Sequence, residues 1–420
     1  MVLEDLFKEA AAMARFRTPP LGPEMDDFCE WLHRQGFKRN VMRRRIWQVS
    51  HFNQFLQNVG IKDCRDVKRS HGERFILEHL PHCRCGGRGI FKHVNEPRSV
   101  RSFLHYLSER GLLEVVSETP PFYQAFLEEY LDSLRRERGL AKQTLKTHRT
   151  NLIPFLEHLG AEAIPSHLGQ LEAEQVQLFC LTSVEKKEAR TMSKPLQGVL
   201  RTFFRFCKKK GYIRRDLTEA VPSIRTYKLA STPRGLSAQD IQRILDHIDR
   251  KSPVGRRDFA IIQLLQTYGV RGGQVSTLQL KDIQWSQSRI RFPALKGGKE
   301  VVEPLLPEIG ESLLDYLRFG RPQAAWPEVF LTAQAPIRPI RNPSTMTAIV
   351  ARHMRRAGVA ELTPGSRSFR HAFATRMLHH GQSLKVIADM LGHRDINTTF
   401  LYTKVDFKTL SLLPLDWPEV

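Results

Sequence analysis

The sequence predicts a mainly helical protein with a small β-sheet, in which two similar N-terminal helical domains precede a mixed α/β domain. Apolar residues recur at helical spacing along most of the chain, and one segment alternates apolar and polar residues as a β-hairpin does. A helical pattern is also repeated at an offset of about one hundred residues. A chain of 420 residues is too long for one hydrophobic core, which agrees with several domains.

The repeated pattern consists of a phenylalanine shortly before a glycine, twice in each unit. The matching pairs are Phe55 before Gly60 with Phe155 before Gly160, and Phe103 before Gly111 with Phe203 before Gly211. Each unit contains an amphipathic segment, a basic segment and a further helix that ends at a glycine. We expect a duplicated helical domain, residues 1–118 and residues 119–221, because a solenoid needs shorter and more numerous units.

The composition indicates a partner of opposite charge. Lys and Arg number 65 against 44 Asp and Glu, a formal net charge of +21. Such an excess is typical of proteins that bind a polyanion, and basic residues on helical segments favour nucleic acid over anionic lipid. We expect no membrane span, lipid anchor or secretory signal, since the sequence shows no long apolar run or anchor motif. A cytoplasmic, nucleoid-associated protein is expected.

Two segments of the duplicated units, residues 38–48 and residues 141–151, place cations beside apolar residues at helical spacing. A charged stripe of this kind is usually a solvated face. On a chain this basic, it also suits a helix laid along a DNA groove with the cations on phosphates. The candidate DNA-binding residues are Lys38, Arg39, Arg43, Arg44, Arg45, Lys142, Lys146 and Arg149.

The six cysteines are sparse and lie in the first half of the chain, which is typical of reduced thiols rather than of a disulfide framework. Cys83 and Cys85 have His79, His82 and His93 nearby, so a zinc site is conceivable. A CxC spacing is unusual for structural zinc, and the sequence does not clearly place a second pair of ligands. We therefore predict no metal.

The mixed α/β domain is predicted to begin after a linker. Residues 222–235 contain prolines, a glycine and several cations without helical periodicity. Ser237 is a suitable N-cap for the first helix of a domain at residues 236–405. Residues 406–420 form a leucine-rich tail, which packs either on its own domain or on a neighbouring protomer.

Cations cluster at two helix boundaries of this domain. Arg271 follows Gly269, a suitable C-cap, so its guanidinium is expected in a turn between two buried helices. Arg367, Arg370 and His371 stand at helical spacing and share one face near a helix N-terminus, an end that attracts anions. A rigidly held guanidinium can donate to two oxygens of one phosphate. These residues predict a phosphate-binding site.

One β-hairpin is predicted between these two boundaries. Ile290 and Phe292 alternate with polar residues, and a Gly-Gly pair at Gly297 supplies a tight turn flanked by Lys296 and Lys299. A lysine at this place can reach into a minor groove and protonate a leaving oxygen. Lysines in turns are, however, more commonly only solvated.

A histidine and a tyrosine follow in the run LGHRDINTTFLYTKV. His393 is expected in the turn after a helix that ends at Gly392, and Asn397 is a suitable cap for a last helix that carries Tyr402. The spacing allows the imidazole and the phenol to meet at one phosphate. A phenol with a pKa of about 10 is a poor nucleophile at neutral pH unless nearby cations favour its anion.

The order Arg271, Lys296, a helix containing Arg-His, the LGH run and Tyr402 resembles that of the tyrosine recombinase (phage integrase) family. The resemblance covers residues 236–405, and residues 122–224 are similar to the helical core-binding domain of that family. The LGH-to-tyrosine run is the most specific of these motifs. The resemblance implies a catalytic domain preceded by DNA-binding helical domains.

The resemblance also implies roles for individual residues. Tyr402 would attack a phosphodiester to give a 3′-phosphotyrosine and a free 5′-hydroxyl. Arg271 and Arg370 would hold the non-bridging oxygens, Lys296 would be the general acid, and His393 would donate a further hydrogen bond. Because the covalent intermediate keeps the bond energy, no cofactor is expected.

Two positions depart from the family pattern. Arg367 stands where the family usually has histidine, three residues before Arg370. Arginine still donates to phosphate, but it cannot shuttle a proton near pH 7. Gln274 stands where an acidic residue is common, and its amide can orient neighbours without charge. His371 is expected to support the site.

The resemblance implies a site-specific DNA recombinase or integrase of a mobile element. It would act on double-stranded DNA as a synaptic tetramer, with accessory or partner proteins. One alternative is a degenerate recombinase that holds DNA without cutting it, for which Arg367 and Gln274 are the support. Another is a relaxing enzyme of the topoisomerase IB kind, which uses the same chemistry without synapsis.

Overall fold

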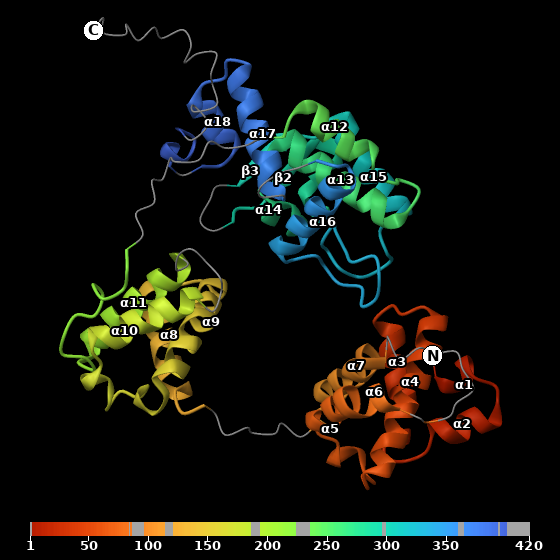
Figure 1. Ribbon diagram of the computed structural model, residues 1–420. Helices are drawn as coiled ribbons and strands as arrows, with labels where there is room; N and C mark the ends of the chain where they lie inside the picture. Colours follow the sequence, from red (N-terminus) through yellow and green to blue (C-terminus); the bar gives the residue numbers. More distant parts are fainter. Residues whose placement is uncertain are drawn as a thin grey trace, which may run out of the picture. The chain divides into compact units, whose positions relative to one another are not determined.

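The computed structural model describes residues 2–83, 85, 96–113, 121–185, 194–223, 236–295, 300–359, 365–393 and 395–400. These residues form helices and one small antiparallel sheet, as the sequence predicts (Figure 1). Their apolar side chains collect in three large clusters that follow one another along the chain. No helix in this part of the chain is both long enough and apolar enough to cross a membrane.

The first helical unit, red to orange in Figure 1, is built around α4 (Arg39–Asn58). Met42, Ile46 and Val49 follow one another at spacings of three and four and are fully buried, so one face of α4 lies in the core. α3 and α7 pack against this helix. The other helices of the unit are α1 (Leu3–Leu6), α2 (Ala10–Phe16), α3 (Met25–Arg34), α5 (Arg69–Arg74), a π-helical turn (Phe75–His79), α6 (Leu80–His82) and α7 (Glu96–Glu109).

The second helical unit, yellow to yellow-green in Figure 1, has its own core, with Tyr130 and Phe204 fully buried. Its helices are α8 (Gln124–Arg138), α9 (Lys142–Leu159), α10 (Ala173–Glu185) and α11 (Lys194–Lys210). α8 ends at Gly139, which adopts the left-handed conformation that favours glycine. α9 packs against both α8 and α11.

The predicted repeat is present as repeated packing. α3, α4 and α7 of the first unit correspond in order to α8, α9 and α11 of the second, and the middle helix contacts the other two in both units. Phe55 and Phe155 are buried at matching places, and so are Phe103 and Phe203. The glycines that follow them, Gly60, Gly160, Gly111 and Gly211, all have positive φ. The predicted boundary between residues 118 and 119 lies outside the described residues.

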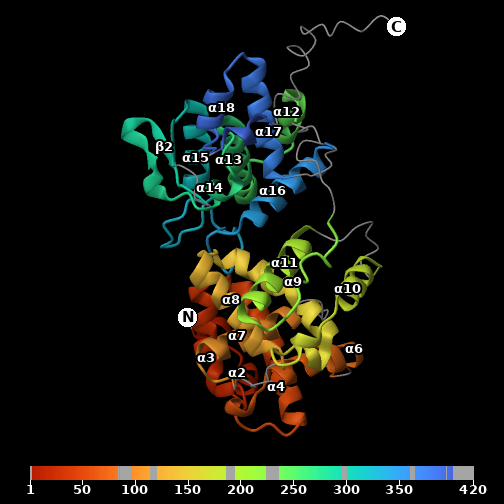
Figure 2. The same ribbon diagram turned by 90° about the vertical axis from the view of Figure 1, so that its left-hand side faces the viewer.

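The mixed α/β part, green to blue in Figure 1, begins with α12 (Ala238–Asp246). Ser237 caps it as predicted, because its Oγ accepts a hydrogen bond of 3.0 Å from the N–H of Asp240. α17 packs against α13 (Figure 1, Figure 2). The remaining helices are α13 (Pro253–Tyr268), α14 (Gly272–Ser276), α15 (Pro307–Phe319), α16 (Pro343–Arg356), α17 (Ser366–His379) and α18 (Leu384–Met390).

The sheet has three antiparallel strands in the order β1 (Ile283–Gln284), β2 (Arg289–Phe292) and β3 (Val301–Pro304). Phe292 pairs with Val301, so β2 and β3 form the predicted hairpin. Residues 296–299 of its turn lie outside the described residues. Ile290 and Phe292 are fully buried and attach the sheet to the core.

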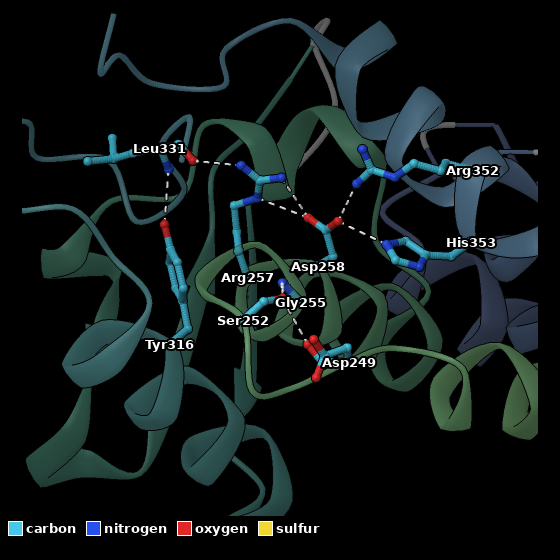
Figure 3. A network of polar contacts seen from close by, with 9 residues as sticks. All are labelled: Asp249, Ser252, Gly255, Arg257, Asp258, Tyr316, Leu331, Arg352 and His353. Atoms are coloured by element: carbon cyan, nitrogen blue, oxygen red, sulfur yellow. Dashed lines mark hydrogen bonds and ion pairs between the residues drawn. The ribbon is translucent and has the colours of Figure 1, made fainter. Parts of the chain in front are cut away.

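A buried ionic network joins α13 to α16 (Figure 3). Asp258, which has no exposed surface, accepts hydrogen bonds from Arg257 (2.8 Å from Nη2), from Arg352 and from His353 (2.9 Å from Nε2). Burial by itself would raise the pKa of Asp258, but the hydrogen bond from His353 and the charges of the two arginines outweigh burial and lower it. The carboxylate is therefore ionised and holds the helices that support the site.

Candidate active site

Two guanidinium groups meet at the end of α18. Arg271 Nη1 lies 3.4 Å from the carbonyl oxygen of Leu391, and Arg370 Nη2 lies 2.8 Å from the same oxygen. Arg370 Nη1 also donates to the carbonyl oxygen of Gly269, 3.0 Å away. The two principal arginines predicted from the sequence therefore come together, with their orientation set by backbone carbonyls.

Small residues allow this approach. α13 ends at Gly269, whose φ of +60° is left-handed, and a Cβ there would lie 2.5 Å from the ring of Phe373 in α17. A Cβ on Gly272, the first residue of α14, would lie 2.7 Å from Ser366 Oγ at the start of α17. Glycine at both positions lets α17 lie close to the turn that carries Arg271.

Gln274 connects Arg271 to the hairpin. Its side chain is buried, its Oε1 accepts a hydrogen bond of 3.0 Å from the N–H of Arg271, and its Nε2 donates to the carbonyl oxygen of Pro293 over 3.2 Å. An ionised carboxylate accepts hydrogen bonds but cannot donate one, so only an amide makes both contacts at neutral pH. Glutamine at position 274, where the family commonly has an acidic residue, can therefore make both of the contacts found in this chain.

His393 lies beside the two arginines. Gly392, with φ +62°, ends α18, and the N–H of His393 donates to the carbonyl oxygen of Ala388 over 2.8 Å. Burial, together with the charges of Arg370 and Arg271, lowers the pKa of His393 to about 4. The imidazole is therefore neutral at pH 7 in the protein without a bound anion, and an anion placed between these groups would raise its pKa.

Thr399 is a site residue that sequence reasoning missed. Its side chain is fully buried, and its Oγ1 lies 2.7 Å from Nδ1 of His393. If the hydroxyl donates to Nδ1, the proton of the neutral ring stands on Nε2, which can then donate to a phosphate oxygen. In the sequence, the one sign of this contact is a hydroxyl residue in the run that follows His393.

Arg367 and His371 lie one turn from each other on α17. Arg367 is exposed, whereas Arg370 is buried. On the helix face predicted for both, Arg367 therefore contacts solvent and Arg370 points into the site. His371 is partly buried, and its pKa is lowered by burial and by the charges of Arg370 and Arg367. His371 is therefore neutral at pH 7 and adds no further charge to the site.

Two predicted catalytic residues, Lys296 and Tyr402, lie outside the described residues. Strands β2 and β3 bracket Lys296 in the sequence, and Phe400 is the last residue that the structure describes before Tyr402. Asn397 lies in a short 3-10 turn, Ile396–Thr398. Tyr402, in the helix that Asn397 was predicted to cap, lies outside the described residues, so the cap stays a prediction. The tail at residues 406–420 also lies outside the described part.

The predicted DNA-binding cations of α4 differ in their surroundings. Arg45 is engaged within its own unit, since its guanidinium lies 4.4 Å from the ring centroid of Phe37 and Nη1 donates to Ser102 Oγ over 2.6 Å. Lys38, Arg39 and Arg43 are exposed, and Arg44 is partly buried. Arg39 and Arg43 also make contacts within the unit, since Arg39 Nη2 donates to the carbonyl oxygen of Asp5 over 2.6 Å and the Arg43 guanidinium lies 5.1 Å from the ring centroid of Phe7. DNA contact by these cations stays a prediction.

α9 shows the same division. Lys142 and Lys146 are exposed, whereas Arg149 forms an ion pair with Glu128 of α8, with 2.5 Å between Nη2 and Oε1. The ion pair neutralises the charge of Arg149 locally. The lysines at the start of α9 therefore remain the stronger candidates for phosphate contact in the second unit.

His51 is a metal-binding side chain that sequence reasoning missed. No metal was predicted because the sequence does not clearly place a second pair of ligands, but the structure places His51 of α4 beside His79, Cys83 and Cys85. His82 is not a member of this cluster, and His93 lies outside the described residues. The cluster belongs to the first helical unit and is separate from the groups around Leu391.

Two family models match the chain. The phage integrase family model matches residues 234–409, and the model of the phage integrase N-terminal SAM-like domain matches residues 127–211. The first match contains Arg271, Arg370 and His393, and the second lies within the second helical unit.

Whole proteins are similar over longer stretches. An integrase/recombinase named y4rA, from Sinorhizobium fredii, is 34% identical over 405 residues, which are 95% of this chain and 96% of that protein. Most of the first helical unit is therefore included. The tyrosine recombinase XerD of Ralstonia nicotianae is 28% identical over 302 residues, 70% of this chain and 94% of XerD.

Solved structures share the fold. The crystal structure of a lambda integrase dimer bound to a COC′ core site has a TM-score of 0.53 at 15% identity, covering 70% of this chain and 98% of that one. A lambda integrase tetramer bound to a Holliday junction has a TM-score of 0.51 at 14% identity, covering 74% and 90%. These neighbours support the same helical and mixed α/β architecture.

Proposed function

The chain belongs to the phage integrase family of tyrosine recombinases, and we propose that it breaks and rejoins double-stranded DNA at specific sites through Tyr402. The observation that carries the proposal is the meeting of Arg271 and Arg370 at the carbonyl oxygen of Leu391, with His393 beside them. Three groups that can donate hydrogen bonds to one phosphate therefore lie near one another.

The arginines would act on the phosphate oxygens. When DNA binds, each guanidinium keeps part of its backbone support and directs its remaining N–H groups to a non-bridging oxygen. Negative charge grows on these oxygens as the phosphorus becomes five-coordinate, and donors already fixed in place stabilise it without reorganising. Two carbonyl oxygens hold the guanidinium of Arg370.

The neutral His393 would donate from Nε2 to a phosphate oxygen while Thr399 holds Nδ1. Tyr402 would give up its phenolic proton to solvent and attack the phosphorus through its phenol oxygen, and the bond to the 5′-oxygen would break. Lys296 would protonate that oxygen, which leaves a 3′-phosphotyrosine and a 5′-hydroxyl. Attack by the 5′-hydroxyl of another strand on the phosphotyrosine then restores the phosphodiester, so the exchange needs no ATP.

We further propose that four copies act together on two DNA sites. The comparison structures of lambda integrase are a dimer bound to a core site and a tetramer bound to a Holliday junction. The second helical unit would bind the core site through Lys142 and Lys146, while the first unit would extend the contact through Lys38 and Arg39. The net charge of +21 supports such binding, and a protein acting in this way works at the nucleoid.

The proposal is tested with a nicked DNA substrate that traps the covalent intermediate. Purified protein is mixed with a DNA substrate taken from the ends of the mobile element that the protein would recombine, without added divalent metal. The products are separated on a denaturing gel. An adduct with the wild-type protein and none with Tyr402→Phe, at equal DNA binding, is the expected result.

An adduct with Tyr402→Phe would remove Tyr402 as the nucleophile. DNA binding by the wild type without any adduct would favour the architectural alternative, in which the protein holds DNA but does not cut it. Adduct formation and relaxation of supercoiled DNA without strand exchange between two sites would favour the enzyme of the topoisomerase IB kind.

A further inference from the structure

Four side chains with metal-binding atoms meet in the first helical unit. His51 comes from α4, His79 from the π-helical turn, Cys83 from the end of α6, and Cys85 from just beyond it. One ligand atom from each, two imidazole nitrogens and two sulfurs, lies within 4.8 Å of every other. Two imidazoles with two thiols form a donor set that zinc commonly takes in structural sites.

The distances between the donors fit one tetrahedral ion. His51 Nε2 lies 3.2 Å from His79 Nε2 and 3.3 Å from Cys83 Sγ, and Cys85 Sγ lies 3.6 Å from His79 Nε2. Zinc bonds of about 2.0 Å to nitrogen and about 2.3 Å to sulfur place tetrahedral neighbours about 3.3 to 3.8 Å apart. A hydrogen bond explains one such contact, but a shared ion explains why all four donor atoms lie within 4.8 Å of one another.

The groups around the donors are also those of a metal site. Glu96 Oε2 lies 3.4 Å from Nδ1 of His51, on the side of the ring opposite to Nε2, and the Glu96 side chain is only 6% exposed. A carboxylate there orients the imidazole and directs Nε2 toward a metal. The N–H of Cys85 donates to Cys83 Sγ over 3.4 Å, a contact that stabilises a thiolate.

The helix geometry explains how His79 reaches this place. The N–H of Leu80 donates to the carbonyl oxygen of Phe75, five residues earlier, which is the π-helical pattern. The wider turn rotates the following residues relative to a regular α-helix. Ring contacts then hold the imidazoles, with the Phe75 ring centroid 5.2 Å from that of His51 and the Phe55 centroid 5.2 Å from that of His79.

We propose that His51, His79, Cys83 and Cys85 bind one zinc ion. Four protein donors fill a tetrahedral shell, so the ion is structural and has no position for a substrate. Binding requires that each thiol gives up its proton to solvent, which makes the affinity fall as the pH is lowered. The ion ties α4 to the end of α6, two elements that are separated in the sequence, and it stabilises the first helical unit.

The test measures zinc in the full-length protein, purified without a histidine tag because a tag itself binds metal. Elemental analysis of the wild type should give one zinc per chain. The double variant Cys83→Ser with Cys85→Ser, and separately His51→Ala, should lose that zinc. The matched control is His82→Ala, because His82 is an exposed histidine of α6 that does not belong to the cluster.

A second measurement on the wild type guards against variants that fail to fold. After removal of zinc with a chelator, cobalt(II) is added, and visible absorption is recorded. Intense bands of tetrahedral cobalt, with sulfur-to-cobalt charge transfer, are expected for two thiolate and two imidazole ligands. In native mass spectrometry, the zinc-loaded chain should be heavier than the metal-free chain by the mass of one zinc minus that of the protons released.

Three results would overturn the proposal. The first is a wild-type protein that contains no zinc after expression in zinc-supplied cells and gives no tetrahedral cobalt spectrum. The second is a disulfide between Cys83 and Cys85 in the freshly purified chain. The third is zinc that stays bound in the folded double-cysteine variant, which would assign the metal to other residues.

Discussion

Arg271 and Arg370 donate hydrogen bonds to the same atom, the carbonyl oxygen of Leu391, although Arg271 lies in the turn before α14 and Arg370 lies in α17. A carbonyl at the end of α18 thereby sets the distance between two cations that would otherwise repel each other. Since His393 follows two residues after Leu391, the same helix end positions all three groups. Disturbing any of the contacts at this point should affect catalysis more than DNA affinity.

Arg370→Lys is expected to slow DNA cleavage by about 100- to 1,000-fold, since a lysine cannot reproduce the two directed donors of the guanidinium. Single-turnover formation of the covalent adduct measures this, with DNA affinity determined in parallel. The matched control is Arg376→Lys, an exposed arginine of the same helix whose Nη2 donates to the carbonyl oxygen of Gln266 over 3.0 Å. Equal rates for Arg370→Lys and the wild type would contradict the proposed role.

Gly272→Ala should lower the free energy of unfolding by about 1–3 kcal/mol and also slow cleavage, because the new methyl group collides with Ser366 Oγ. α17, and with it Arg370, would have to move away from Arg271. Gly310→Ala in α15 is the control, since a Cβ there meets nothing closer than 3.8 Å and alanine favours a helix. Urea unfolding of both variants provides the comparison, and equal effects would refute the packing argument.

The pH dependence of stability should reveal His393. Its pKa of about 4 lies below the ordinary value of 6.5 for histidine, so the unfolded chain binds a proton in this range that the folded chain does not. The contribution of His393 to stability is therefore complete above pH 6.5 and falls as the pH is lowered toward 4. The loss is at most about 1.4 kcal/mol per pH unit.

His393→Gln removes this titration, so the difference in free energy of unfolding between the wild type and the variant should change with pH within that window only. Urea titrations at several pH values measure the difference. A constant difference from pH 7 to pH 4 would show that His393 has an ordinary pKa.

Thr399→Val should reduce cleavage because the imidazole of His393 loses the hydroxyl 2.7 Å from Nδ1. Valine has nearly the shape of threonine, so the fold is retained at this buried position. Thr399→Ser keeps the hydroxyl and should recover most of the activity. Nitrogen NMR of the imidazole adds a readout that packing alone would not change: in the wild type the proton should stand on Nε2. A cleavage rate of Thr399→Val equal to that of the wild type would contradict the proposed positioning role of Thr399.

Asp258→Asn should cost about 3–5 kcal/mol of stability, because the buried Arg257 would lose the carboxylate that compensates its charge. The control is Asp315→Asn. Asp315 pairs with Arg256 over 3.2 Å, but both side chains are 25% exposed, so a cost of about 0–1 kcal/mol is expected. Thermal unfolding of the two variants distinguishes them, and similar losses would mean that burial of Asp258 is unimportant.

Much of the helical architecture could be predicted, because it depends on interactions between neighbours in the chain. Apolar residues such as Met42 and Ile46 recur at helical spacing, and Ser237 caps a helix by a contact three residues away. The β-hairpin follows from the alternation of Ile290 and Phe292.

The sequence by itself determined which residue types stand at positions 271, 370 and 393. The predicted roles of these residues, and of Lys296 and Tyr402, come from the resemblance of their order and spacing to the tyrosine recombinase family. The tertiary structure decided which of these groups share one acceptor, that Thr399 contacts His393, and that His51 completes a set of four metal-binding side chains. The physical reason is that sequence periodicity reports which residues lie on one face of a single element. Which faces of different elements meet at one point depends on how the helices pack, and this involves residues far apart in the chain.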